Sequence, residues 1–271
     1  MLGAVAGDVI GSVWEIEGWK SPHFEPLIGP ECRFTDDTVL TCAVAEALLT
    51  DGDYAKHIRA FARRYPRAGY GGNFQRWFRS DRPGPYGSWG NGSAMRVSPV
   101  GWAFDTVAET LAEAERSAAV THNHPRGVAG GQATAWAVFL ARTGASKEQL
   151  KDEIAARFGY DLNRTLAEIR PRYCFDVSCD GSVPEALIAF LEATDYESAV
   201  RNAISLGGDA DTQAAIAGAV AEAFYQRRTG VGVPEPIAEQ VRERLPDDLT
   251  DVLDRFTTGR VRPSSPPPAA E

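Results

Sequence analysis

Carboxylates and hydroxyls gather at two points of the sequence, each directly before a stretch of helical periodicity. The later point is GGDADT at 207–212. It is followed by an alanine-rich segment, 214–224, in which Ile216, Val220 and Phe224 fall on one helical face. Two carboxylates and a hydroxyl at the start of an apolar helix are costly to leave unpaired, so we expect positive charge against them.

A helix cap is the simplest explanation of this cluster, because Asp and Thr are preferred N-cap residues and complement the helix dipole. On that interpretation Asp211 or Thr212 caps the helix. A cap does not require two carboxylates after two glycines, however. Gly207 and Gly208 allow the backbone to turn sharply, so the side chains of Asp209 and Asp211 can converge on one point.

The second cluster, TDDT at 35–38, has the same position relative to a helix. It precedes the segment 39–49, where Leu40, Val44 and Leu48 mark a helical stripe. Carboxylates and hydroxyls from two helix starts form an oxygen-only ligand set, which suits hard cations such as Mg²⁺ or Mn²⁺. The number of such groups is enough for a pair of ions, so the sequence predicts a binuclear site for divalent cations.

The motifs of the chain resemble those of the ADP-ribosylglycohydrolase family from Gly3 to about Tyr225. The motifs that carry the resemblance are, in order, TDDT at 35–38, GNGSAMR at 90–96 and GGDADT at 207–212. Ala210 departs from the pattern, since the family has Thr or Ser there, but this position is not a ligand. The residues that the resemblance implies as metal ligands are Thr35, Asp36, Asp37, Asp209, Asp211 and Thr212.

Glu15 is treated differently by residue chemistry and by resemblance. Taken alone, a single Glu before the Pro-rich segment 16–33 is a solvated carboxylate, because Glu is seldom fully buried. The run 7–15 resembles the first motif of the family, in which the corresponding Glu reaches the metal centre, and 16–33 then corresponds to a mobile loop beside the substrate cleft. Either Asp36 or Glu15 could accept the proton of the attacking water.

A glycine-rich segment in the middle of the chain is the candidate for binding the nucleotide. Its backbone amides, free of bulky side chains, suit a pyrophosphate cradle. The resemblance implies that Gly87 and Ser88 contact phosphate, that Trp89 stacks on adenine, and that His122 hydrogen-bonds a phosphate. A zinc site at His122 and His124 is disfavoured because no third ligand has a matching spacing. The predicted cradle comprises Gly87, Ser88, Trp89, Gly90, Asn91 and Gly92.

The composition of the chain limits the classes of binding partner and the cellular compartment that we expect. The chain has 271 residues and a formal charge of 28 − 37 = −9, so non-specific attraction to nucleic acid or anionic membranes is not expected. Four scattered cysteines do not form a disulfide framework. No signal peptide or membrane span is visible, and we predict a cytoplasmic monomer.

Nearly every segment has helical periodicity and none alternates as a strand does, which predicts an all-α, single-domain orthogonal helical bundle. The resemblance implies that this bundle is of the ADP-ribosylglycohydrolase type. We predict a domain over 1–258 and a disordered Pro-rich tail over 259–271. The segment 66–94 is predicted to lack regular structure. The predicted helices cover 4–13, 39–49, 54–65, 94–104, 106–120, 127–140, 146–158, 162–169, 182–190, 196–205, 214–224 and one or two segments of 236–256.

The function that the resemblance implies is hydrolysis of the N- or O-glycosidic bond at the distal ribose of ADP-ribose, which releases ADP-ribose from a modified target. Two divalent metal ions are expected as cofactors, Mg²⁺ first and Mn²⁺ as the alternative. The leaving group stays open among arginine, serine, an acetyl ester and nucleic acid. Two rival functions are a metal-dependent phosphohydrolase that cuts the pyrophosphate and a non-catalytic protein that binds ADP-ribose.

Overall fold

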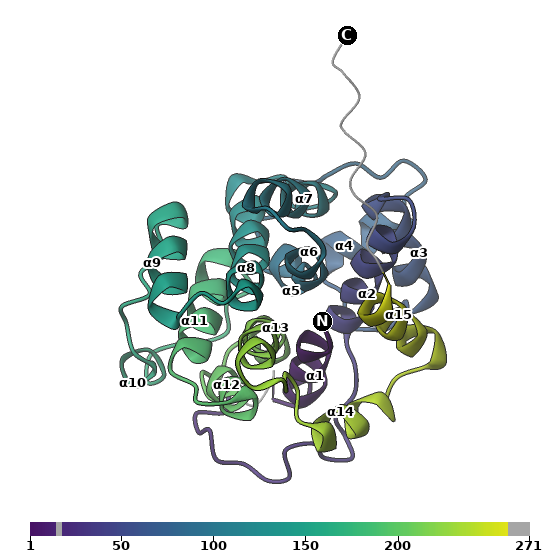
Figure 1. The fold of residues 1–271 in the computed structure, drawn as a ribbon. Helices are drawn as coiled ribbons and strands as arrows, with labels where there is room; N and C mark the ends of the chain where they lie inside the picture. Colours follow the sequence, from purple (N-terminus) through teal and green to yellow (C-terminus); the bar gives the residue numbers. More distant parts are fainter. Residues whose placement is uncertain (15–17, 260–271) are drawn as a thin grey trace.

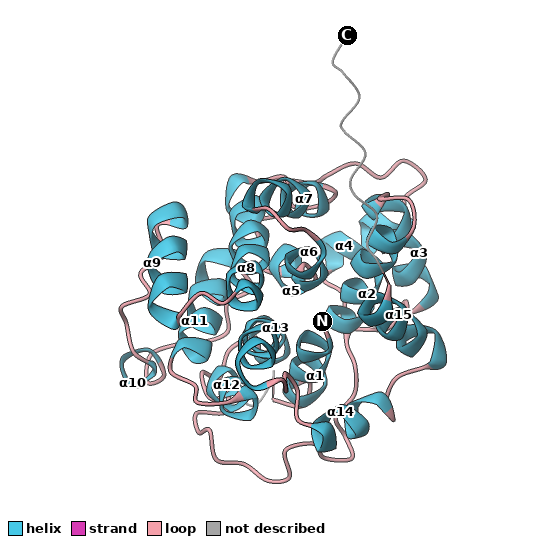
Figure 2. Ribbon diagram, in the orientation of Figure 1, coloured by secondary structure: helices cyan, strands magenta, loops and turns pink. Residues whose placement is uncertain are grey.

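The computed structural model describes residues 1–14 and 18–259, and in these residues the fold is helical throughout (Figure 1, Figure 2). The described part contains fifteen α-helices and no strand, apart from an antiparallel bridge between Gly90 and Ser178. The helices are α1 Leu2–Gly11, α2 Asp36–Leu49, α3 Tyr54–Arg64, α4 Gly72–Arg79, α5 Gly92–Met95, α6 Ser98–Ala103, α7 Val107–Ala119, α8 Pro125–Thr143, α9 Lys147–Phe158, α10 Leu166–Ile169, α11 Cys179–Leu191, α12 Tyr196–Ile204, α13 Ala210–Thr229, α14 Glu235–Arg242 and α15 Asp247–Thr258. The all-α prediction is confirmed, and so is the orthogonal bundle, since the helices of Figure 1 share no common direction.

The helix α13 lies at the centre of the molecule and packs against α1, α8, α11 and α12. Every residue of α13 from Ala210 to Phe224 is buried. A helix buried on all sides needs apolar residues around its whole circumference, which explains the many alanines of this segment.

The closest packing in the centre is between α13 and α1, and glycines make it possible. A Cβ atom at Gly7 would lie 2.1 Å from the carbonyl oxygen of Ala214, and one at Gly11 would lie 2.5 Å from the Cα of Asp211. Any larger side chain at Gly7 or Gly11 would therefore push the helices apart. This contact places Asp8 of α1 beside the acidic start of α13.

The structure differs from the prediction most clearly in the segment 66–94, which contains the helix α4. Phe74, Trp77 and Phe78 of α4 are buried, whereas Arg76 and Arg79 are exposed. The prediction of irregular structure was therefore wrong for 72–79. The aromatic residues have helical spacing, and burying them stabilises a short helix despite the flanking glycines.

Smaller differences concern the ends of elements. The predicted helix 94–104 is two helices, α5 and α6, and of 162–169 only the last four residues are helical. The helix α15 ends at Thr258, and the predicted tail beyond Gly259 lies outside the described residues. Within the described ranges no helix is both long and apolar enough to cross a membrane.

Candidate active site

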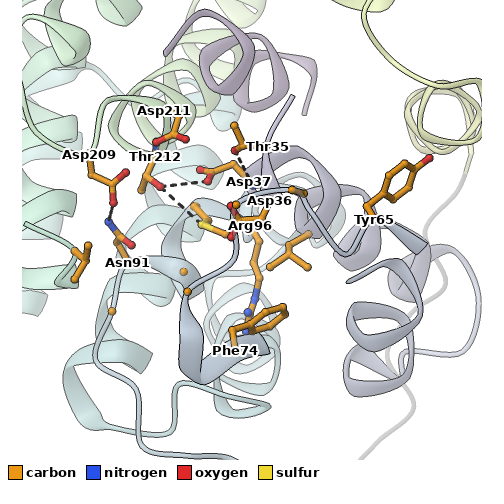
Figure 3. Close-up of a pocket in the computed structure, with 18 of the residues that line it drawn as sticks. Thr35, Asp36, Asp37, Tyr65, Phe74, Asn91, Arg96, Asp209, Asp211 and Thr212 are labelled. Atoms are coloured by element: carbon orange, nitrogen blue, oxygen red, sulfur yellow. Dashed lines mark hydrogen bonds between the residues drawn. The ribbon is translucent and has the colours of Figure 1, made fainter. Parts of the chain in front are cut away.

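A cavity of about 810 Å³ opens where the N-terminal ends of α2 and α13 meet (Figure 3). The acidic end of the cavity is formed by these two helix starts. Its other walls come from the segments 64–74 and 86–96, with Phe175 and Val177 at the rim. The predicted site residues that line it are Thr35, Asp36, Asp37, Ser88, Gly90, Asn91, Gly92, His122, Asp209, Asp211 and Thr212.

Three buried carboxylates from three helices converge at the acidic end. Asp8 of α1, Asp37 of α2 and Asp211 of α13 each place an oxygen within 4.8 Å of the others, an arrangement that could hold a metal ion. Figure 3 shows Asp37, Asp211 and Thr212 pointing toward one another. The hydroxyl of Thr212 donates to Oδ2 of Asp37 at 3.2 Å, which joins α13 to α2.

The residues present fit a hard cation. Oδ1 of Asp37 is buried and has no hydrogen-bond partner among the described residues. Burial, together with the charges of Asp211, Asp8, Asp36 and Asp209, raises the pKa of Asp37 well above its ordinary value. A buried carboxylate oxygen without a donor, surrounded by other carboxylates, is stabilised by a cation with oxygen ligands.

Asp8 was not predicted as a site residue. Its Oδ1 accepts from the hydroxyl of Thr35 at 2.6 Å, and its Oδ2 accepts from the amides of Thr35 at 2.9 Å and Thr38 at 3.1 Å and from the Thr38 hydroxyl. Asp8 therefore anchors the first turn of α2 from a neighbouring helix. Burial, reinforced by the charge of Asp211, raises the pKa of Asp8 to about 7, although these hydrogen bonds act in the opposite direction.

A sequence signal for Asp8 existed. It is the one acidic residue in the small, apolar segment of α1, and it is fully buried. Since a buried carboxylate requires donors, an Asp at this position indicates a polar contact inside the core. The sequence could not identify Thr35 and Thr38 as the donors, because that pairing depends on how α1 packs beside α2.

The capping interpretation is wrong for α13 and holds for part of α2. The N-cap of α13 is Asp209, not Asp211 or Thr212, and the Asp209 side chain makes no capping hydrogen bond. Instead Nδ2 of Asn91 donates to Oδ2 of Asp209 at 2.7 Å. At α2, by contrast, Thr35 is a true cap whose hydroxyl accepts from the amide of Asp37 at 3.3 Å.

Asp36 lies beside the carboxylate cluster and lines the cavity. Its amide donates to the carbonyl of Ala68 at 2.7 Å. Gly69, which has a φ of +114°, follows Ala68, and a Cβ atom there would lie 3.0 Å from Oδ1 of Asp36. A glycine at this position therefore leaves the Asp36 carboxylate accessible from the cavity.

The glycine-rich segment uses most of its backbone amides within the protein. The amide of Gly87 donates to Oδ1 of Asn123 at 2.7 Å, that of Asn91 to the Val177 carbonyl at 2.7 Å, and that of Gly90 to the Ser88 hydroxyl at 3.2 Å. These amides are not available for a pyrophosphate cradle. Side chains of this segment and its neighbours are left to supply the donors.

The predicted adenine platform, Trp89, does not line the cavity. Gly87 is likewise not among the residues that line it. Trp89 is 50% exposed, and its carbonyl accepts from the amide of Cys179 at 3.0 Å, so its backbone lies beside the segment that follows Val177. Phe175 and Val177, which line the cavity, are also exposed apolar residues.

His122 is buried against the glycine-rich segment. Its Nδ1 lies 2.7 Å from the Thr121 hydroxyl. Its Nε2 faces Gly92, where a Cβ atom would lie 3.1 Å away. Burial, together with the charge of Arg96, lowers the pKa of His122 well below its ordinary value, so the ring is neutral near pH 7.

Arg96 is a second residue that the sequence analysis did not assign. It is fully buried and also lines the cavity, and in Figure 3 its side chain extends away from the group of Asp37, Asp211 and Thr212. It is the last residue of the motif GNGSAMR, of which only the glycines and the asparagine were predicted to bind the ligand. Glu15, the other candidate for the general base, lies outside the described residues.

The chain is similar in sequence and in fold to known proteins. A family model described as ADP-ribosylglycohydrolase matches residues 1–265. The chain is similar to ADP-ribosylhydrolase ARH3 of Mus musculus, with 28% identity over 83% of this chain and 82% of that protein. It is also similar to ADP-ribosylarginine hydrolase Tri1 of Pseudomonas putida, with 27% identity over 93% of this chain and 76% of that protein. A solved structure titled ADP-ribosylglycohydrolase-related protein complex matches with a TM-score of 0.66 and 27% identity, covering 95% of this chain and 97% of that one.

Proposed function

Since the chain belongs to the ADP-ribosylglycohydrolase family, we propose that it hydrolyses the glycosidic bond between the distal ribose of ADP-ribose and a modified target. The observation that carries this proposal is the meeting of buried carboxylates from α1, α2 and α13 at one end of a cavity that has a buried arginine and histidine elsewhere in its lining. Such a cavity can hold a sugar beside cations and a diphosphate beside cationic and N–H donors.

The residues that would hold the divalent ions are grouped at the acidic end. Their oxygens suit Mg²⁺, and Mn²⁺ is the alternative. When bound, two such ions would supply positive charge that attracts the ribose hydroxyls and lowers the pKa of a nearby water. The proposed ligands are Thr35, Asp36, Asp37, Asp209, Asp211 and Thr212.

Asp8 contributes by positioning. The two oxygens of Asp8 together accept four hydrogen bonds from Thr35 and Thr38, three of them at Oδ2, so only Oδ1 keeps a lone pair that a cation could use. The bond from the Thr35 hydroxyl to Asp8 fixes the direction of its proton, and since one lone pair accepts from the Asp37 amide, the other is left for a cation. We therefore assign Asp8 to orienting Thr35 rather than to the primary ligand set.

Asp36 is the described residue that can act as general base. A carboxylate in the cavity can take a proton from the attacking water while the water oxygen bonds to the anomeric carbon and the glycosidic electrons leave with the target atom, which gains a proton. The negative charge of the cluster stabilises the oxocarbenium character that develops on the ribose. Glu15 is the second candidate for the base, on the strength of its place in the family's first motif.

The diphosphate is proposed to lie toward Ser88 and His122, with the adenine against Trp89 at the apolar rim. The Ser88 hydroxyl and the His122 ring are two of the side-chain donors that line this part of the cavity. Gly90, Asn91 and Gly92 bring the backbone close to the ligand because two of the three have no side chain. Gly87 shapes the turn before them, with a φ of +67°.

The relatives of this chain differ in the leaving group that their names print or leave open, so the leaving group has to be proposed separately from the reaction. The relatives named above are hydrolases of ADP-ribosyl groups, one of them named for ADP-ribosylarginine. We propose a target among arginine, serine, an acetyl ester and nucleic acid, acted on by a cytoplasmic monomer. Light scattering on the purified protein would check the monomer.

Product identity tests the proposed function. The chain should be incubated with ADP-ribosyl-arginine, an ADP-ribosyl-serine peptide, O-acetyl-ADP-ribose and an ADP-ribosylated oligonucleotide, each with Mg²⁺, with Mn²⁺ and with EDTA, and the products separated by chromatography. We expect ADP-ribose from at least one substrate, only with metal, and none from the Asp37→Asn variant. AMP with ribose phosphate would show a phosphohydrolase instead, and binding without turnover a non-catalytic protein.

A further inference from the structure

The buried Arg96 makes few contacts for a guanidinium. Its Nη2 donates to the Ser117 carbonyl at 3.0 Å and to the Thr121 hydroxyl at 2.9 Å. Within the described part of the chain its Nε and Nη1 have no hydrogen-bond partner, and no carboxylate there forms an ion pair with it. A fully buried charge with so few partners is expensive, so a role beyond packing is expected.

The contact with Thr121 determines how that hydroxyl is used. Thr121 is fully buried, and its oxygen must be the acceptor toward Arg96, because a guanidinium only donates. The proton of the Thr121 hydroxyl therefore needs a separate acceptor. Among the described residues the only acceptor in reach is Nδ1 of His122, at 2.7 Å.

The alternative direction of this bond leaves a donor unsatisfied. If Nδ1 carried a proton and donated to Thr121, the threonine oxygen would accept twice and its own proton would be buried without a partner. An unsatisfied buried donor destabilises the fold, which favours the first direction. In that direction Nδ1 is the acceptor and the ring proton of the neutral histidine is on Nε2.

We propose that Arg96, acting through Thr121, is a positioning residue that fixes His122 in the tautomer protonated on Nε2, so that a neutral ring presents an N–H donor to a diphosphate oxygen. Nε2 faces Gly92 on the cavity side and has no partner among the described residues. The other neutral tautomer would direct a lone pair at the anion and repel it. The diphosphate rests on the proposed function, whereas the tautomer does not.

Burial and the charge of Arg96, which lower the pKa of His122, support the same arrangement, since they keep a second proton off the ring. In this relay of Arg96, Thr121 and His122 the buried cation acts indirectly, because Arg96 orients the Thr121 hydroxyl and that hydroxyl orients the His122 ring. Glycines at 90 and 92 leave the Nε2 side of the ring open.

The test compares substitutions at Thr121 with a matched control. Thr121→Val removes the hydroxyl, Thr121→Ser retains it, and Thr134→Val removes a buried hydroxyl that has no hydrogen-bond partner among the described residues. Nitrogen NMR of ¹⁵N-histidine-labelled protein, without ligand, reports which ring nitrogen of His122 carries the proton. We expect Nε2 protonation in the wild type, Thr121→Ser and Thr134→Val, and a mixture of tautomers in Thr121→Val.

Titration with ADP-ribose provides the second readout. Affinity should fall about tenfold in Thr121→Val, as for loss of a hydrogen bond to a charged group, and stay near wild type in Thr121→Ser and Thr134→Val. Thermal unfolding of each variant separates this effect from a loss of fold. A wild-type His122 protonated on Nδ1, or a Thr121→Val variant with an unchanged tautomer, would overturn the relay. Nε2 protonation in a wild type that does not bind ADP-ribose would support the relay and overturn the proposed ligand.

Discussion

The acidic end of the cavity and the Arg96 region are both short of opposite charge. In the first, Asp8, Asp37 and Asp211 are buried together and no lysine or arginine of the described residues forms an ion pair with them. In the second, Arg96 is buried without a carboxylate, beside a neutral His122.

The separation of the two charged regions indicates that bound ligands supply the missing opposite charges. A stable core pairs its buried charges internally, as Glu222 does with the Met1 amine at 2.9 Å. The cavity instead keeps the two signs apart, and we propose that cations complete one end and an anion completes the other. A molecule with ribose hydroxyls at one end and a diphosphate in the middle satisfies both.

The largest effect at the acidic end of the cavity is expected from Asp211→Asn. Turnover should fall by orders of magnitude, because asparagine keeps the shape and the acceptor for the Thr212 amide but removes the charge. The matched control is Asp195→Asn, at a true N-cap of α12 whose side chain accepts from the Ser198 amide at 2.7 Å. Steady-state rates on the best substrate of the panel measure both. Wild-type turnover in Asp211→Asn would make that carboxylate a structural residue.

Glu15→Gln sharpens the choice of the general base. If Glu15 acts in the chemical step, kcat should fall by at least about a hundredfold while the affinity for ADP-ribose changes by only several-fold. Single-turnover kinetics and calorimetric titration on the same variant separate the two effects. An unchanged kcat would leave Asp36 as the base.

Gly92→Ala tests the opposite end. The added Cβ atom would lie 3.1 Å from Nε2 and 3.2 Å from Cε1 of His122, which displaces the ring or blocks its donor. We expect the affinity for ADP-ribose to fall about tenfold. Gly84→Ala is the control, since a Cβ there meets no atom within 4 Å. Equal affinities in the two variants would place the ligand away from His122.

The smallest expected effect is on stability. In the metal-free protein the pKa of Asp8, about 7, is above the 3.8 of an exposed aspartate, so the native state holds a proton that the unfolded state has lost. Between these values the free energy of unfolding of the metal-free protein should therefore fall as pH rises. Added Mg²⁺ should raise the Tm by a few degrees more at about pH 8 than at about pH 5. An equal rise at both pH values would argue against cations at this cluster.

The sequence predicted the helical fold because its evidence is local: the stripes of α2 and α13 and the small residues of α1 are visible in periodicity alone. The convergence of TDDT and GGDADT was predicted from the chemistry of the ligand set. Asp8 and Arg96 were missed because each matters through a neighbour distant in sequence, Thr35 in one case and Thr121 in the other. Such pairings arise from packing, which periodicity does not encode.

The cap of α13 was placed wrongly for a related reason. Sequence rules assume that an N-cap side chain bonds to its own helix, whereas the Asp209 side chain accepts from Asn91, which is distant in sequence. The tertiary contact outweighs the local preference at this position. The segment 72–79 shows the same effect, because buried aromatic residues make a helix where glycines suggested a loop.

The most direct test is calorimetric titration of ADP-ribose into the wild-type protein with Mg²⁺ and with EDTA. If cations complete one end of the cavity and the diphosphate the other, the two ligands share the ribose and must bind cooperatively. The affinity for ADP-ribose should be at least about tenfold higher with Mg²⁺, and by reciprocity the affinity for Mg²⁺ should rise equally with ADP-ribose. Equal affinities for ADP-ribose with Mg²⁺ and with EDTA would contradict this account.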